Sequence, residues 1–210
     1  MEKKIAKHLL DIGAVFLRPD QPFTWASGIE SPIYCDNRLT LSYPEVRKEI
    51  ENGLADIIKN EFKDCEGVFG TSTAGIAHAA IVAEILGLPM GYVRGSAKDH
   101  GRTNQIEGRA IEGSKVVVVE DLISTGGSCV DVVNVLRNAK CEVLGIVSIF
   151  TYGMKKGLDN LEKNNVKNIS LSNLDALVKV AVEHGFIKES DIEKILTFRE
   201  NPTNSNWKNI

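Results

Sequence analysis

The sequence lacks the cysteine patterns of a disulfide-bonded or zinc-binding protein. Its four cysteines, Cys35, Cys65, Cys129 and Cys141, include no CxxC pair, and no histidine stands at ligand spacing from them. Scattered cysteines are typical of reduced thiols, because disulfide frameworks and zinc sites need regularly spaced ones. We therefore expect a cytoplasmic protein without a structural zinc site.

Long apolar runs and clusters of one charge are also missing. No apolar stretch approaches the roughly 20 residues that cross a bilayer, and the amphipathic start Met-Glu-Lys-Lys does not resemble a signal peptide. A formal net charge of -3 provides no basic surface for nucleic acid or for a membrane. A length of 210 residues suits one α/β domain. These absences favour a protein that acts on small molecules.

Two common phosphate-binding motifs are absent as well. A Walker loop requires Gly-Lys followed by Ser or Thr, and neither this tripeptide nor a GxGxxG fingerprint occurs. The chain has instead the string KVVVVEDLISTGGS over residues 115–128. The four consecutive valines in this string predict a strand that is buried on both faces, as in a parallel sheet.

The residues after the valines indicate an anion site. Glu120 and Asp121 are adjacent, residues 124–128 form a turn rich in hydroxyls and glycine, and residues 129–139 have the spacing of a helix. Free N–H groups and the positive end of the helix dipole favour phosphate at such a turn. The turn could serve only as a helix cap. However, adjacent carboxylates repel each other by about 1–4 kcal/mol at contact distance, and a phosphorylated sugar explains both features.

A second small-residue turn follows another predicted strand. Residues 67–70 are expected to form this strand, Thr71-Ser72-Thr73-Ala74-Gly75 the turn, and residues 76–86 a helix that Gly87 ends. Carboxyl ends of parallel strands share one edge of a sheet. The two turns could therefore hold two separate phosphate groups.

A polar segment over residues 95–113 has glycines and no apolar periodicity. Structureless segments of this length inside a domain are commonly functional loops. Positive charge lies along it and just before it, on Arg94, Lys98, His100 and Arg102. We expect a loop that closes over a polyphosphate, and the alternative is an ordinary solvated surface loop.

The remaining pattern completes an α/β domain over residues 1–210. Helices are expected at residues 3–12, 44–62, 155–163 and 172–184 and from residue 190, and strands at 89–94, 142–150 and 166–170. An antiparallel hairpin is expected within residues 23–38, where Phe23 and Trp25 could cover a flat ring or belong to the core. Residues 1–40 would then form a small hood, and a frayed polar tail is expected over residues 201–210.

Four segments together resemble the orotate phosphoribosyltransferase family of type I phosphoribosyltransferases over nearly the full length. They are FTWASGIESPIYCDNR, VFGTSTAGI, VRGSAKDHG and VVVVEDLISTGGS. The resemblance implies a central parallel sheet flanked by helices, with a small N-terminal hood. It also implies transfer of phosphoribose from 5-phosphoribosyl 1-diphosphate to orotate with Mg2+, in a homodimer with shared active sites.

The same resemblance implies roles for particular residues. Lys98 and His100 would be catalytic, and Ser124 would reach orotate. The diphosphate substrate would contact Arg94, Lys98, His100, Glu120, Asp121, Leu122, Ile123, Ser124, Thr125, Gly126, Gly127 and Ser128. No side chain is implied as a metal ligand.

The chain departs from the family pattern at four positions. Many members have a second lysine at the place of Gly95. Some also have lysine at the places of Ala26 and Ala74, and an orotate-binding arginine after the strand that ends here in Phe150-Thr151-Tyr152. The candidates for binding the orotate carboxylate are therefore Arg38 and the backbone N–H groups near Ser27 and Gly28. Two other functions remain open: transfer to another base, or a non-catalytic regulator that senses phosphoribosyl diphosphate.

Overall fold

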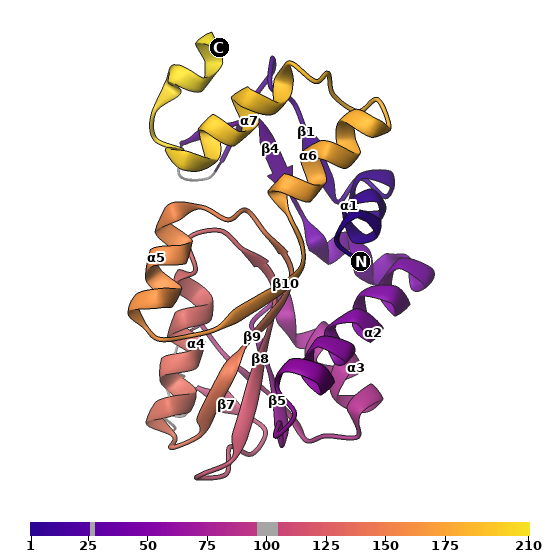
Figure 1. The fold of residues 1–210 in the computed structure, drawn as a ribbon. Coiled ribbons are helices and arrows are strands. Elements are labelled where there is room, and N and C mark those ends of the chain that lie inside the picture. The colour runs from indigo at the N-terminus through magenta and orange to yellow at the C-terminus, as the bar shows by residue number, and fades with distance from the viewer. Residues whose placement is uncertain (26–27, 96–104) are drawn as a thin grey trace.

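A six-stranded, mostly parallel sheet forms the centre of the computed structural model, which describes residues 1–25, 28–95 and 105–210 (Figure 1). Its strands lie in the order β10-β9-β8-β5-β6-β7. Their bounds are β5 Gly67–Thr71, β6 Met90–Val93, β7 Ile106–Glu107, β8 Lys115–Ile123, β9 Glu142–Thr151 and β10 Asn168–Asn173. All neighbours pair in parallel except β7, which is antiparallel to β6. The expected α/β architecture is confirmed.

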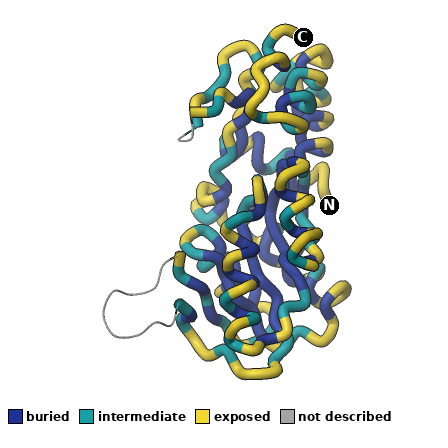
Figure 2. The backbone as a smooth tube through the Cα atoms, turned by 90° about the vertical axis from the view of Figure 1, so that its left-hand side faces the viewer, coloured by how far each residue is buried: buried dark blue, intermediate teal, exposed yellow. Residues whose placement is uncertain are grey.

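The four valines of β8 divide between the two faces of the sheet. Val117 and Val119 belong to one apolar cluster, and Val116 and Val118 belong to a second. This division follows from the two-residue period of a strand. All four are at most 1% exposed, and the central strands form the buried interior of the molecule (Figure 2). The prediction of a strand buried on both faces is confirmed.

Helices cover both faces of the sheet (Figure 1). Helices α2 (Pro44–Glu61) and α3 (Gly75–Leu86) pack on one face, and α4 (Gly127–Asn138) and α5 (Lys155–Lys163) lie on the other. Strand β5 lies between β6 and β8, so the chain moves to one side of β5 and later returns to the other. Ligands of open α/β sheets bind where the connections diverge in this way, at the carboxyl ends of the strands. The sheet order therefore directs attention to the ends of β5 and β8.

Both ends of the chain build the part of the molecule above this sheet edge (Figure 1). The N-terminal share contains α1 Glu2–Asp11, β1 Val15–Leu17, β2 Phe23–Thr24, β3 Glu30–Ser31, β4 Ile33–Cys35 and the 3-10 helix η1 Asn37–Ser42. The C-terminal share contains α6 Leu174–Glu183, α7 Asp191–Glu200 and the 3-10 helix η2 Ser205–Asn209. Helix α1 packs on α6, and Trp25 packs on Phe198 with ring centroids 5.6 Å apart. The hood, residues 1–40, thus shares its core with C-terminal helices, and the half-buried Trp25 packs against that core.

Four sequence expectations are corrected. The predicted hairpin contains only β2 and β3, because β4 pairs with β1 instead. Strand β7 lies inside the segment that was expected to be a loop. The helix expected from residue 172 begins at Leu174 as α6, because Asn173 caps it by accepting from the Ala176 N–H, whereas the Ser172 hydroxyl donates to the Glu2 carbonyl.

The fourth correction concerns the C-terminus. The expectation of a frayed tail is wrong, because Trp207 in η2 is only 1% exposed and packs edge-on against Phe198. The buried indole explains why this polar segment stays folded onto α7. Among the residues that the structure describes, no helix is long and apolar enough to cross a membrane.

We predict that Trp207→Ala lowers the free energy of unfolding by about 3 kcal/mol, as expected when a buried aromatic side chain is removed. Urea denaturation followed by circular dichroism measures this change. Ile210→Ala serves as the control, since Ile210 lies in the same segment and is 48% exposed. Equal unfolding midpoints for the two variants would contradict the buried anchor.

Candidate functional site

The carboxyl ends of β5 and β8 enclose a cleft of about 370 Å³. The cleft is lined by Cys35, Asp36, Arg38, Ser72, Thr73, Ala74, Glu120, Asp121, Leu122 and Ser128. These residues come from three places: the hood, the turn after β5, and the end of β8 with its following turn. The two small-residue turns predicted from the sequence therefore lie at one site.

Glu120 is held in a buried position at the centre of this site. Glu120 is only 5% exposed. Its Oε1 atom accepts a 2.8 Å hydrogen bond from the Thr71 hydroxyl and a 2.9 Å bond from the Asp121 backbone N–H. Thr71 is the last residue of β5, so the two strands are joined by side chains just beyond the end of their pairing at Gly70 and Val119.

Burial and the neighbouring carboxylate raise the pKa of Glu120 to about 8. Removal from water is the larger cause, because it disfavours the charged form. Asp121 adds to the shift by hydrogen bonding and charge repulsion, while Thr71 opposes it. The sequence argument placed two repelling carboxylates at a strand end. In the structure β8 continues to Ile123, and burial contributes more than repulsion.

The turn between β8 and α4 has the geometry of an anion-binding helix start. Gly126 caps α4 with a φ of 71°, a left-handed conformation that favours glycine. The first N–H groups of α4 lack partners within the helix and point toward this turn. Helix α5 supports the turn from behind. A Cβ atom at Gly157 would lie 2.3 Å from the Ser124 carbonyl oxygen, so only glycine permits this approach.

The turn after β5 is equally close-packed. A Cβ atom at Gly75 would lie 2.4 Å from the Val119 carbonyl oxygen, so α3 begins directly against β8. The Ser72 N–H donates to the Val93 carbonyl at 3.2 Å, and the Ser72–Thr73 peptide bond is cis. The close approach at Gly75 and the hydrogen bond at Ser72 anchor the two ends of this turn at the edge of the cleft.

Arg94 lies beside this turn, one residue after β6. Its Nε atom is 3.3 Å from a Glu107 carboxylate oxygen, and its backbone N–H donates to the Gln105 carbonyl at 2.9 Å. Arg94, the residue just before the predicted functional loop of residues 95–113, is therefore connected to residues within that loop. Lys98, His100 and Arg102 lie outside the described residues.

The hood supplies the opposite wall of the cleft. Arg38 forms a forked ion pair with Asp36, with contacts of 2.6 and 2.7 Å. Arg38 is the one cation among the described residues that line the cleft. The pKa of Asp36 is lowered by this hydrogen-bonded guanidinium.

The structure unites only part of the predicted substrate-binding set. Glu120, Asp121, Leu122 and Ser128 line the cleft together. Ile123 is 2% exposed and contributes its side chain to the core.

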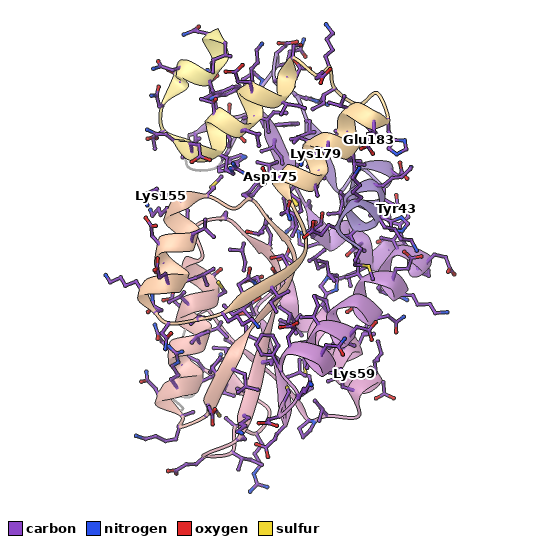
Figure 3. All side chains as sticks on the ribbon, in the orientation of Figure 1. Tyr43, Lys59, Lys155, Asp175, Lys179 and Glu183 are labelled. Atoms are coloured by element: carbon purple, nitrogen blue, oxygen red, sulfur yellow. The ribbon has the colours of Figure 1, made fainter. Side chains whose placement is uncertain are left out.

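Thr125 faces a neighbouring cavity. This cavity, of about 450 Å³, lies between α5 and α7, and Trp25, Lys155 and Arg199 also line it. Figure 3 shows Lys155 at the end of α5 that lies below α7.

Three supporting residues were not found from the sequence. Thr71 was recognised only as part of a turn, and nothing in the sequence linked its hydroxyl to Glu120. Gly157 lies in a predicted helix whose packing partner could not be known. Asn37 donates a 2.7 Å hydrogen bond to the Asp121 carbonyl from 84 residues away. No local pattern signals contacts over such separations.

Comparisons with known proteins agree with this geometry. Residues 42–183 match the family described as "Phosphoribosyl transferase domain". The chain is 59% identical over 207 residues to orotate phosphoribosyltransferase of Bacillus mycoides, and the match covers 99% of both chains. A solved orotate phosphoribosyltransferase from Aeropyrum pernix superposes with a TM-score of 0.74 at 30% identity, covering 87% of this chain and 99% of that one.

A third relative shows likeness of fold. The Mycobacterium tuberculosis orotate phosphoribosyltransferase in complex with 5-phospho-alpha-D-ribosyl 1-diphosphate has a TM-score of 0.66 and 21% identity. The match covers 84% of this chain and 98% of that one.

The raised pKa of Glu120 predicts a pH-dependent stability. The folded protein binds this proton more tightly than the unfolded chain, so the bound proton stabilises the fold. This contribution is fully present below the ordinary carboxyl pKa of 4.5 and is lost as pH rises to about 8. Glu120→Gln, which cannot ionise, should lose less stability over this interval than the wild type.

Urea denaturation at a series of pH values measures this difference. Glu142→Gln removes an exposed carboxylate from the neighbouring strand and controls for the loss of one charge. Parallel stability curves for the wild type and Glu120→Gln between pH 4.5 and 8 would contradict the shift.

Proposed function

The chain belongs to the phosphoribosyltransferase family, as an orotate phosphoribosyltransferase, and from this premise we propose how its cleft binds and activates the substrates. The reaction transfers phosphoribose from 5-phosphoribosyl 1-diphosphate to orotate and yields orotidine 5'-monophosphate and diphosphate, in pyrimidine biosynthesis. The observation that supports the proposal most is the meeting of two anion-binding turns and an acidic pair in one cleft.

The turn at residues 124–128 is the proposed site of the 5'-phosphate. Its helix N-terminus provides N–H donors and a positive dipole end, and the Ser128 side chain lies in the cleft. Thr125, Gly126 and Gly127 would contribute backbone groups, as would Ile123, since its side chain is in the core. Ser124 would reach orotate at the start of the same turn.

The acidic pair is the proposed ribose site. Asp121 is half-buried and lines the cleft, so its carboxylate can accept hydrogen bonds from ribose hydroxyls. Glu120 lies behind it and is engaged by Thr71. Leu122 would provide apolar contact beside the sugar, since it is half-buried and lines the same cleft.

The diphosphate would lie against residues 72–74 and receive positive charge from the loop. Transfer at the anomeric carbon passes through a loose, cation-like transition state, so catalysis rests on positioning the reactants and stabilising the departing negative charge. We assign this role to Lys98 and His100, with Arg94 at the loop base. Arg38 is a candidate for the orotate carboxylate, provided that it exchanges its Asp36 partner for the ligand.

Mg2+ fits this cleft as an ion carried by the substrate. The described residues contain no group of three or more His, Cys, Asp or Glu side chains arranged to hold a metal. Mg2+ commonly binds substrate phosphates with few protein ligands. The substrate phosphates would hold the ion, and the acidic pair would face it. The ion would offset the repulsion between the phosphates and the acidic pair.

The proposed activity predicts that orotate absorbance falls when the protein is mixed with orotate, 5-phosphoribosyl 1-diphosphate and Mg2+. Adenine, guanine and hypoxanthine, as parallel acceptors, should give no product, which separates this activity from transfer to another base. Excess chelator should stop turnover, and added Mg2+ should restore it. Undiminished turnover in chelator would refute the metal requirement, and no turnover of any base would favour the non-catalytic regulator.

We further propose a cytoplasmic homodimer with shared active sites. Strands β1 and β4 place Phe16 directly opposite Tyr34, and both rings are over 40% exposed. Leu39 and Tyr43 are also exposed nearby along the chain. Exposed aromatic groups of this kind mark interaction surfaces. Because Tyr34 precedes Cys35, which lines the cleft, a second copy bound here would lie beside the active site.

Shared sites predict complementation between two inactive variants. Lys98→Ala removes a loop cation and Asp121→Asn alters the ribose site, so each homodimer should be nearly inactive. After subunit exchange, hybrid dimers should each contain one site with both residues intact. Random exchange makes about half the dimers hybrid, so activity should recover to about a quarter of the wild-type value.

The control is each variant taken through the same exchange procedure alone. Exchange itself is followed by fluorescence transfer between labelled subunits. No recovery despite measured exchange would show that Lys98 acts within its own subunit or is not catalytic.

A further inference from the structure

Asn37 is a fully buried polar residue between the hood and the acidic pair. It is 0% exposed and begins η1. A buried amide must find hydrogen-bond partners, because leaving one unpaired costs about 1–3 kcal/mol. Asn37 has two such partners, Cys35 in the hood and Asp121 in β8, and both of these residues line the cleft.

The orientation of the Asn37 amide is fixed by its partners. Its Nδ2 atom lies 2.7 Å from the Asp121 carbonyl oxygen, which can only accept. Its Oδ1 atom accepts from the Cys35 thiol at 3.2 Å. Burial raises the pKa of Cys35, so this thiol keeps the proton that it donates. The reverse orientation would place two acceptors against each other.

The Asp121 carbonyl lies in the part of β8 that no longer pairs with β5. Pairing of β8 with β5 ends at Val119, two residues earlier. The Asp121 N–H is bound by the Glu120 carboxylate and its carbonyl by Asn37. Both peptide groups that flank the Asp121 side chain are therefore held by side chains, and one of these comes from the hood.

The backbone of Asn37 is itself held in place. Its carbonyl accepts a 2.6 Å hydrogen bond from the buried Thr40 hydroxyl. The residues on either side of it, Asp36 and Arg38, line the cleft. A displacement of this segment would therefore reach Asp121 through one short hydrogen bond.

We propose that Asn37 is a positioning residue that holds Asp121 in the geometry for ribose binding and couples the hood to that site. The inference rests on the proposed function of the cleft. Asn37 contacts the backbone of Asp121, is fully buried, and is not among the residues that line the cleft. Its removal should therefore weaken the binding of 5-phosphoribosyl 1-diphosphate while the affinity for orotate is retained.

The first test compares Asn37→Ala with the wild type. The Kd of 5-phosphoribosyl 1-diphosphate with Mg2+, measured by titration calorimetry, should rise about fivefold, the effect of one neutral hydrogen bond. The KM for orotate should change less than twofold. Asn168→Ala is the control: it removes an Asn side chain that donates to the Ile146 carbonyl from β10, the edge strand of the same sheet. This control should leave both constants unchanged.

The second test separates positioning from packing. Asn37→Asp keeps the side-chain shape, but the new carboxyl group can donate to the Asp121 carbonyl only when protonated. The ratio of its kcat/KM for 5-phosphoribosyl 1-diphosphate to the wild-type value should therefore fall as pH rises. A purely structural role predicts a ratio that does not change with pH in the folded protein.

Each outcome decides between the claims. If the wild type turns over orotate but Asn37→Ala weakens both substrates equally, or weakens neither, the inference is overturned and the proposed function stands. A pH-independent ratio for folded Asn37→Asp would do the same. Absence of orotate turnover by the wild type would overturn the proposed function and this inference with it.

Discussion

The burial of one carboxyl group, that of Glu120, is the constraint on which the site depends. Strands β5 and β8 stop pairing at Gly70 and Val119, and the Glu120 carboxyl group accepts hydrogen bonds just beyond this point. Thr71 binds it from β5, so the end of β5 is fixed relative to the acidic pair on β8. A buried carboxyl group costs stability when it ionises, as its raised pKa indicates. We attribute the presence of this costly group to substrate binding.

The fold places this constraint where a ligand can use it. The sheet reverses its order between β5 and β8, which opens the crevice at their carboxyl ends. Helices α3 and α4 begin there, and glycines at Gly75 and Gly157 let backbone segments approach closely around the two turns. The hood closes the remaining side through η1. Its stability depends on the C-terminal segment, since Trp25, Phe198 and Trp207 share one cluster.

Local patterns predicted the sheet and the two turns, because those features depend on neighbouring residues. The valines of β8 alternate between the faces as a strand requires, and the helices after both turns begin within two residues of the predicted starts. Long-range pairing could not be predicted in this way. Strand β1 pairs with β4 across 15 intervening residues, and the short strand β7 has only two residues from which to recognise it. The tail containing Trp207 resembles a disordered segment until the cluster that buries it is known.

The central claim is that the acidic pair serves substrate binding more than folding. The test measures the affinity of the wild type and of Asp121→Asn for ribose 5-phosphate, which lacks the diphosphate. The melting temperature is measured on the same samples. The account predicts that affinity falls about tenfold, the effect of about 1.4 kcal/mol, while the melting temperature is unchanged, because the Asp121 side chain is half-buried and lines the cleft. Unchanged affinity, or a melting temperature that collapses with it, would contradict the account.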